Sequence, residues 1–488
     1  MSCCGSTSSP FLPLPLRLPR SHAQTLTLTP PRRVRPFSSS LSAAPSVSDP
    51  FVLEIAEKLE DSLSSSPIQS LPPLQTLRES SSRSLLSTPW PTRKSDPFRF
   101  TDISYLRKYP LVPTQTPAIP SSPIDSPFSN LLVIVDGVLA PSLSRLSALP
   151  DGVFVGSIGN APAGALYDRI QSVLASGSEF EKDLFWDLNS VGALDVAVIY
   201  VPLRVRMLEP IHVQFGYSGG AGEGEEIMAM SNPRVLVVAE EGAEVALVEE
   251  HFGVDGGEEK CYWANPVMEI VVEDGAKVSH SYVQRQPIKA AHVKWTVARQ
   301  KSSSTYNLVE VNTGAKLSRH NLHIQQLGPD TVTELSSFHL SSRNKQIHDL
   351  HSRLVLDHPR GYSRQLHKCI VCESEAHAIF DGNIKVNRFA QNTDAGQQAK
   401  CLLLAPQALV HVKPNLQIVA DDVKCSHGAA ISDLEDQQLF YFRARGVDLK
   451  TARDALIFSF GAEVVRQIPF KPIQEKVANE VKELFTSL

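Results

Sequence analysis

The segment KPNLQIVADDVKCSHGAAISDLEDQQLFYFRARG, residues 413–446, carries the most informative pattern in the chain. It begins with alternating apolar residues, which predict a strand, and it ends in an amphipathic pattern, which predicts a helix. Between these two patterns lie Cys425 and His427. Side chains two positions apart in a strand share a face, so the thiol and the imidazole are predicted to point the same way. Both groups are ligands that suit iron or zinc.

The composition around this segment is that of a soluble globular protein of two or three domains. The chain has 488 residues, of which 42% are hydrophobic and 20% are charged, and its net charge is -5. No apolar run approaches the roughly 18 residues of a membrane-spanning helix, so no membrane insertion is expected. Residues 1–48 hold five arginines and no acidic residue or lysine, which leaves a net charge of -10 on the rest. This acidic balance argues against nucleic acid as a partner.

Residues 1–48 are predicted to be a plastid transit peptide. They are rich in Ser, Pro and Arg, and they lack the sustained apolar core of a secretory signal. The absence of an Arg-rich amphipathic helix favours the plastid over the mitochondrion, and cleavage is expected between about Phe37 and Ser48. A merely disordered tail is the alternative. Five cysteines follow the leader at irregular spacing, which does not resemble a disulfide framework and fits a reducing compartment such as the plastid stroma.

The rest of the chain changes character twice. Asp49 and Pro50 suit the N-cap and first position of a helix, and an apolar stripe extends that helix to about Leu63. The Ser- and Pro-rich stretch 64–125 is expected to hold short helical pieces at best. Further strands are expected at 131–140 and 152–159, and helices at 165–173 and 183–189. The predicted organisation is a helical and linker region at 49–190, a strand-rich core at 191–430 and a helical domain at 431–488.

An internal repeat runs through the strand-rich core. The segments EEGAEVALVEE (240–250), EDGAKVSHSYV (273–283) and NTGAKLSRHNL (312–322) share a Gly-Ala pair between apolar alternating runs. Glycine can adopt a positive φ at a corner, and the small alanine lets neighbouring turns stack closely. Repeats of this kind predict the stacked turns of a β-helix or a similar solenoid. An antiparallel sandwich is the structural alternative.

The motif KPNLQIVADDVKCSHGA followed by LFYFRARG resembles the C-terminal core of the SufB/SufD family, whose members are scaffold components of iron–sulfur cluster assembly. The resemblance extends from about Pro89 to the C-terminus and is greatest to plastid SufD. The segment TPWPTRKSDPFRFTDISYLRKY is also similar to SufD, although Pro97 and Phe98 replace the usual acidic residue and Trp. The resemblance implies a mainly β protein with a right-handed parallel β-helix core, an N-terminal helical region and a C-terminal helical domain.

The resemblance also implies a function. The chain is expected to be a non-catalytic scaffold subunit of a SufBCD-type complex, pairing with a SufB-like subunit as a heterodimer and docking a SufC-like ATPase without binding a nucleotide itself. Iron or a nascent cluster is expected at Cys425 and His427, held transiently and shared with the partner, because two ligands do not complete a tetrahedral site. The docking region for the ATPase is placed at four residues of the C-terminal domain, Leu434, Leu439, Phe442 and Arg445.

Several other patterns are interpreted as structural. Cys369 and Cys372 form a CxxC pair, but residues three apart in a strand point to opposite faces, so the pair is expected to be part of the core. The glycine-rich stretch 215–226 is predicted to be a hairpin loop, because no lysine is placed to meet a phosphate. Glu249 and Glu250 invite comparison with the carboxylates of β-helix glycan hydrolases or lyases, but adjacent acids point apart. A structural adaptor without metal ligands is the remaining alternative.

Overall fold

The computed structural model describes residues 49–63, 71–114, 124–147, 149–175, 182–219, 227–254 and 260–486. The predicted transit peptide at 1–48 lies outside the described residues, and so does most of the glycine-rich stretch, at 220–226. Neither prediction is therefore tested by the structure. Within the described ranges, no helix combines the length and the apolar character that crossing a membrane requires.

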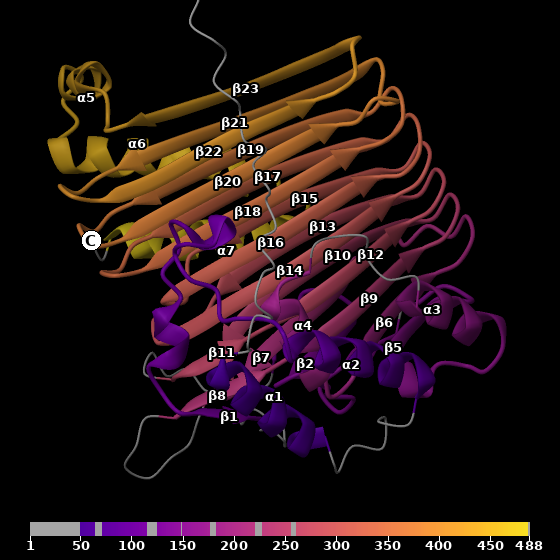
Figure 1. Ribbon diagram of the computed structural model, residues 1–488. Coiled ribbons are helices and arrows are strands. Elements are labelled where there is room, and N and C mark those ends of the chain that lie inside the picture. Colours follow the sequence, from indigo (N-terminus) through magenta and orange to yellow (C-terminus); the bar gives the residue numbers. More distant parts are fainter. Residues whose placement is uncertain are drawn as a thin grey trace, which may run out of the picture. The chain divides into compact units, whose positions relative to one another are not determined.

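The core is a parallel β-solenoid in which each turn adds one strand to a first sheet and the next strand to a second sheet (Figure 1). The first sheet has the order β5 (Phe154–Ser157), β6 (Ala197–Val201), β9 (Arg234–Ala239), β12 (Val267–Val272), β14 (Ala290–Gln300), β16 (Leu317–Gln326), β18 (Ile347–Leu356), β20 (His377–Val386) and β22 (Leu409–Ile418). At its side lie β1 (Leu111–Pro113), β8 (Met228–Ser231) and β11 (Tyr262–Ala264).

The second sheet faces the first across the interior. It has the order β3 (Val138–Leu139), β2 (Asn130–Val135), β7 (Ile211–Tyr217), β10 (Glu244–Gly253), β13 (Lys277–Arg285), β15 (Thr305–Asn312), β17 (Val332–Ser341), β19 (Tyr362–Val371), β21 (Thr393–Leu403) and β23 (Val423–Ser432), with β4 (Arg145–Leu146) beside β2. Pairing between successive turns is parallel and in unbroken register, for example from Leu317 with Ile347 to Gln326 with Leu356. The predicted solenoid is confirmed, and the antiparallel sandwich is wrong.

One corner of the solenoid uses a residue in the left-handed backbone region at successive turns. Gly242 and Gly275 both have φ +68° there, and the alanine that follows each of them is fully buried. The N–H of Gly242 donates to the carbonyl of Asp274 in the next turn at 2.9 Å, so the corner continues the ladder of the strands. Later turns place other residues with positive φ at this corner, namely Ser303, Asp330, Arg360 and Asn392.

The third Gly-Ala pair does not share this frame, which corrects the sequence prediction. Gly314 lies between β15 and β16, at the opposite corner from Gly242 and Gly275. A Cβ at Gly314 would lie 2.2 Å from the backbone nitrogen of Gln286, so close backbone approach requires glycine there. The true counterpart in the first frame is Ser303, which the Gly-Ala pattern did not reveal.

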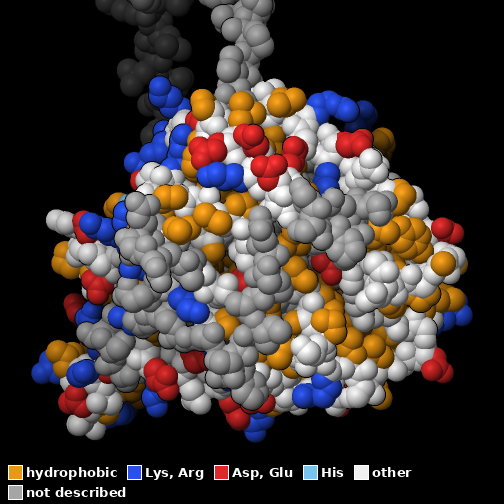
Figure 2. Space-filling view, turned by 90° about the horizontal axis from the view of Figure 1, so that it is seen from below, with side chains coloured by type: hydrophobic (Ala, Val, Ile, Leu, Met, Phe, Trp, Pro, Cys, Tyr) orange, Lys and Arg blue, Asp and Glu red, His pale blue; other side chains and the backbone are white. Residues whose placement is uncertain are grey.

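Helices near the N-terminus cover the outer face of the early turns of the first sheet. They are α1 (Pro50–Leu63), α2 (Pro72–Leu85), α3 (Ala165–Ala175) and α4 (Leu184–Gly192), with short 3-10 turns η2 (Asp96–Phe98), η3 (Ser104–Arg107) and η4 (Ile158–Asn160). One apolar cluster joins α1 and α4 to outward-facing side chains of β12 and β14, such as Trp295. Figure 2 views this end of the molecule, where apolar side chains and charges of both signs intermingle.

The predicted helices at 50–63, 165–173 and 183–189 are confirmed, but α2 was missed. Its sequence, PPLQTLRESSSRSL, holds serines that favour turns over helix interiors. Leu74 and Leu85 are nevertheless each about 1% exposed, because α2 packs against neighbouring elements. Tertiary packing therefore stabilises a helix that local propensity disfavours.

The C-terminal helices form the predicted helical domain, but they do not close the end of the solenoid as a cap would. They are α5 (Asp436–Arg443), α6 (Leu449–Val465) and α7 (Lys471–Thr486). An apolar cluster joins α6 and α7 to outward-facing residues of the second sheet, among them Val283, Phe338 and Ile370. The two helices therefore run back along the flank of the second sheet (Figure 1), and the turn formed by β22 and β23 stays open.

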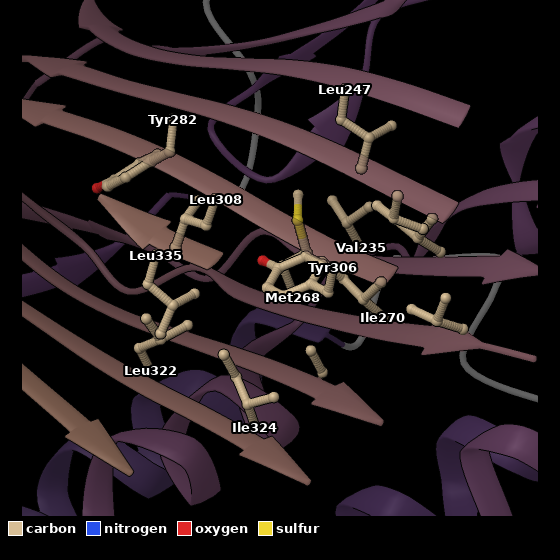
Figure 3. Packing of buried hydrophobic residues seen from close by; sticks show 14 of the residues in the cluster. Val235, Leu247, Met268, Ile270, Tyr282, Tyr306, Leu308, Leu322, Ile324 and Leu335 are labelled. Atoms are coloured by element: carbon tan, nitrogen blue, oxygen red, sulfur yellow. The ribbon is translucent and has the colours of Figure 1, made fainter. Parts of the chain in front are cut away.

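The interior between the sheets is apolar in many positions but also holds buried charges. Figure 3 shows side chains from both sheets meeting there, including Met268 and Tyr306. Glu249 lies among them, with its carboxylate 2.5 Å from Lys294 Nζ and 2.8 Å from His280 Nε2. Burial raises the pKa of Glu249, but Lys294 and the neighbouring histidines lower it further, so the net shift is well below the ordinary value. The carboxylate therefore stays ionised and paired.

Burial keeps several interior histidines neutral. It lowers the pKa of His251 to about 4 and that of His348 to about 3. In the unfolded chain a histidine titrates near pH ~6.5. Between these values the unfolded state binds more protons than the folded state, so stability is lost as the pH falls.

We expect the free energy of unfolding to decrease as the pH falls from 6.5 to 5, above the range in which most carboxylates titrate. Urea unfolding at each pH measures this slope. The variant His348→Gln keeps a donor for the carbonyl of Gly314 and removes one such group. Its slope is expected to be shallower by up to about 1.4 kcal/mol per pH unit. Equal slopes for the two proteins would contradict a neutral His348.

Candidate functional site

The last turn of the solenoid leaves a strand edge open in each sheet. Among the described strands, β22 pairs only with β20, and β23 pairs only with β21. Unpaired edges of parallel strands present free N–H and C=O groups to any further strand. Pro414 removes one N–H from β22, whereas β23 contains no proline. The β23 edge is therefore the more complete template for an added strand.

Apolar side chains are exposed near this open turn. Val419 is 56% exposed after β22, and Ile431 is 51% exposed on β23. A long edge with exposed apolar residues marks an interaction surface rather than a solvated end.

Cys425 and His427 lie on β23 and follow the columns of interior-facing residues. They are in register with Ala395 and Gln397 of β21, both of which are buried. Cys425 is half-buried and packs against the interior core, whereas His427 is exposed at the open turn. The alternation predicted from the sequence therefore places the thiol and the imidazole on one face, at the rim of the interior. Neither group lies deep in the apolar stack.

The Cys425 thiol is not activated in the chain alone. Burial raises its pKa, the backbone hydrogen bond with Ala395 partly opposes this shift, and the charge of Asp394 raises the pKa further. A thiol with a raised pKa stays protonated near neutral pH. A metal ion or an added cation is therefore needed to favour the thiolate.

The two groups do not form a complete metal site by themselves. Across the ranges that the structure describes, no group of three or more His, Cys, Asp or Glu side chains is arranged to hold a metal ion. Cys425 and His427 can therefore supply two ligands, and a four-coordinate ion needs the others from elsewhere.

The residues predicted to dock an ATPase are only partly on one helix. Leu434 precedes α5, Leu439 and Phe442 lie on it, and Arg445 follows it. Leu434, Leu439 and Phe442 are half-buried, and Leu434 packs against the cluster around α6 and α7. The strand β23 continues to Ser432 and a short connection follows, which is why the helix begins only at Asp436.

The exposed aromatic residues of this region are two that the sequence analysis did not select. Phe440 is 74% exposed and Tyr441 is 54% exposed, and α5 itself buries no residue. The guanidinium of Arg445 lies 3.6 Å from the centroid of the Tyr441 ring, so this predicted residue does belong to the exposed patch. The helical period shows that a helix has apolar residues on one face. It does not show which residues pack against the rest of the chain and which stay exposed.

The CxxC pair is divided as predicted, and one of its members has an unforeseen partner. Cys369 faces the interior and is fully buried, whereas Cys372 is half-buried beyond the end of β19. Cys369 is in register with Cys401 of β21, and a hydrogen bond between their thiols together with burial raises the pKa of Cys369. The spacing of 32 residues gave no sign of this pair, because only the solenoid brings the two strands together.

The carboxylates considered for glycan chemistry lie apart. Glu249 is in the interior, whereas Glu250 contacts Lys476 of α7 at 3.3 Å on the outer side of the second sheet. The adjacent acids therefore point to opposite faces, as predicted, and each has a structural partner. This arrangement gives no support to a hydrolase or lyase.

Comparison with known proteins places these features in a family. Residues 221–460 match the SufBD core domain of the SUF system for FeS cluster assembly, and residues 59–213 match the SufBD protein N-terminal region. The chain is 53% identical over 458 residues to "Protein ABCI7, chloroplastic" of Arabidopsis thaliana, covering 93% of this chain and 94% of the relative.

Two bacterial relatives extend the comparison. An iron–sulfur cluster assembly SufBD family protein of Synechocystis is 34% identical over 398 residues, covering 79% of this chain and 86% of the relative. The iron–sulfur cluster assembly protein SufD of Escherichia coli is 29% identical over 402 residues, covering 80% of this chain and 89% of the relative.

A parallel solenoid whose core and N-terminal region both match family models defines an iron–sulfur cluster assembly protein of the SUF type. The chain belongs to the SufB/SufD family, and its similarity to SufD of Escherichia coli identifies it as SufD-like. The family resemblance of the Lys413–Gly446 segment is thereby confirmed, and a scaffold role fits the fold.

The burial of the cysteines predicts their order of reaction. Among the five cysteines that the structure describes, we expect iodoacetamide at pH 8 to label Cys425 first, although more slowly than an unhindered peptide thiol, because its raised pKa lowers the thiolate fraction. Burial raises the pKa of Cys372 to about 12, so it should react much more slowly. Peptide mass spectrometry at timed intervals measures the order, and Cys425→Ser should remove the first label. Earlier labelling of Cys369 or Cys372 would be the contrary result.

Proposed function

We propose that this chain is a non-catalytic scaffold subunit that pairs with a SufB-like partner through its open turn and presents Cys425 and His427 at that seam. The observation that carries the proposal is the unpaired β23 edge, with a thiol and an imidazole on one face of it. A strand from the partner would supply the missing backbone hydrogen bonds and cover the exposed apolar residues.

The proposed cargo is iron or a nascent iron–sulfur cluster. His427 offers a ring nitrogen, and Cys425 offers a sulfur once its proton leaves on metal binding. The partner chain or the sulfide of the cluster itself would complete the coordination. Two ligands at an accessible rim favour transient transfer over permanent storage.

A SufC-like ATPase is the proposed second partner, and α5 is its proposed docking site. Phe440, Tyr441 and Leu449 are exposed apolar residues beside Arg445, and aromatic and arginine residues are typical anchors of protein interfaces. Only residues 433–435 separate β23 from α5, so movement of a bound ATPase is transmitted to the seam through a short connection. The chain's sequence contains no GxxxxGK[ST] motif, which is consistent with a nucleotide bound by the partner alone.

The proposed location is the plastid stroma. The composition of residues 1–48 favours a plastid transit peptide, and the Arabidopsis relative is named as a chloroplastic protein. The five cysteines that the structure describes are all free thiols, three of them buried and two half-buried, and the absence of disulfides among them fits a reducing compartment.

The ligand role is tested in the assembled complex with the SufB-like and SufC-like partners. We expect His427→Ala to lower the iron and acid-labile sulfide that the purified complex retains, and Cys425→Ser to lower them less, because its thiol needs deprotonation. Metal analysis and sulfide assay measure both. Ser426→Ala is the matched control, since Ser426 lies between the two on the opposite face of β23. Unchanged iron in an intact His427→Ala complex would favour a pure adaptor.

The docking role is tested by removing the exposed aromatic rings. We expect Phe440→Ala with Tyr441→Ala to weaken binding of the ATPase subunit by about 30-fold or more, because buried aromatic anchors contribute about 2 kcal/mol or more. Binding of the purified ATPase to the immobilised heterodimer measures this change. Leu208→Ala, an exposed apolar residue before β7, is the control. Equal affinity for both variants would place the docking site elsewhere.

A further inference from the structure

We propose that Gln397 is a positioning residue for His427, with its side-chain carbonyl accepting a hydrogen bond from the inward ring nitrogen of the imidazole. This inference deepens the proposed function and rests on it for its significance. It concerns residues of one interior column that end at the open turn.

The column is defined by the register of three parallel strands. Gln365 of β19, Gln397 of β21 and His427 of β23 are directly opposite one another in successive turns. Gln365 and Gln397 are both buried, and their amides are already linked, because Gln397 Nε2 donates to Gln365 Oε1 at 2.9 Å. Stacked amides in register form ladders in which each rung bonds to the next. His427 occupies the next rung.

In this pair of amides, one polar atom of each glutamine takes part in the hydrogen bond and the other does not. Gln365 Nε2 and Gln397 Oε1 are buried atoms that make no hydrogen bond with the described residues in this structure, so the proposed bond requires the exposed imidazole of His427 to turn toward Gln397. Gln397 is only 1% exposed, so water does not readily replace a partner. Gln397 Nε2 already donates to Gln365, whereas Gln397 Oε1 has no partner, so the unsatisfied atom of Gln397 is an acceptor. An imidazole N–H on the next rung is the donor that matches it.

The opposite wall of the solenoid is built to admit the Gln397 side chain. Gly382 of β20 faces it from the first sheet, and a Cβ at Gly382 would lie 2.3 Å from Gln397 Nε2. Gly382 has an ordinary negative φ, since it is not among the residues with positive φ. The backbone does not require glycine at this position, so the exclusion of a side chain is steric: a Cβ would meet the amide of Gln397 and would also lie 2.6 Å from Phe380 Cζ.

An acceptor below His427 has a chemical consequence. It holds the proton on the inward ring nitrogen and leaves the lone pair of the other nitrogen directed away from the interior, toward the seam. Metal-binding histidines characteristically donate their second N–H to a carbonyl or carboxylate, which fixes the tautomer and the orientation of the ring. Gln397 is therefore suited to present His427 to incoming iron.

The test measures the tautomer of His427 directly, in the full mature chain without iron. Two-bond ¹H–¹⁵N correlation spectra of ¹⁵N-histidine-labelled protein distinguish the protonated ring nitrogen, and His427→Asn identifies the signal. We expect one tautomer to dominate in the wild type and Gln397→Met to change the tautomer ratio by about fivefold, the size of one net hydrogen bond. Iron retained by the assembled complex should fall by about tenfold or more.

Two further variants separate positioning from packing. Gln397→Glu keeps an acceptor without the amino group, so it should retain the wild-type tautomer. Gln365→Met makes the same chemical change as Gln397→Met one turn deeper, and it should leave the tautomer ratio of His427 unchanged. An unchanged ratio in Gln397→Met, or an equal change in Gln365→Met, would overturn the proposal.

The outcomes also separate this inference from the proposed function. If Gln397→Met changes the tautomer ratio of His427 but His427→Ala leaves the iron content of the complex unchanged, the hydrogen bond is supported and the ligand role fails. If iron depends on His427 but Gln397→Met leaves both tautomer and iron unchanged, the ligand role stands and the positioning role is overturned.

Discussion

The in-register parallel ladder between successive turns is the constraint on which the rest of the structure depends. Each strand satisfies its backbone groups with the turn before and the turn after it, and the left-handed corner at Gly242 and its counterparts continues the same pattern. Buried backbone polar groups must be paired, so a solenoid is stable only while another turn follows. The last turn has no following turn, and its open edge is a direct consequence of the architecture.

The same register arranges the side chains in columns. A residue in one strand lies opposite its counterpart in the next turn. Side chains stacked in this way contact each other along the axis of the solenoid, and polar ones can pair. Glu249 is paired with Lys294 and histidines within this interior, and Gln365 is paired with Gln397 two rungs below the rim. Polar groups such as these can be buried because a neighbouring strand or the same strand supplies a partner. His427 ends one such column at the last turn, where the strand edge is unpaired among the described strands.

The sequence predicted the repetitive parts of the fold well, because each depends on local pattern. The helix Pro50–Leu63 has an N-cap, a proline and an apolar stripe, and it forms as expected. Gly314 was assigned to the same corner as Gly242 and Gly275, but it lies at the opposite one. Glycine is needed for its positive φ at the first corner and for close backbone approach at the second. The helix α2 was missed, because its serines disfavour a helix that only packing stabilises. The site was predicted as a pair, while Cys401, Gln397 and Phe440 were not singled out, since their roles come from other strands or from exposure.

By itself, the sequence determined that strands stack in turns and that Cys425 and His427 share a face, because strand alternation and repeat period are local properties of the chain. Tertiary structure alone decided that α6 and α7 flank the second sheet instead of capping its end, because apolar faces of helix and sheet must match across residues distant in sequence. That choice leaves the final turn uncovered. Which residues lie beneath His427 also depends on strand register, which links positions about 30 residues apart through hydrogen bonds that no local pattern encodes.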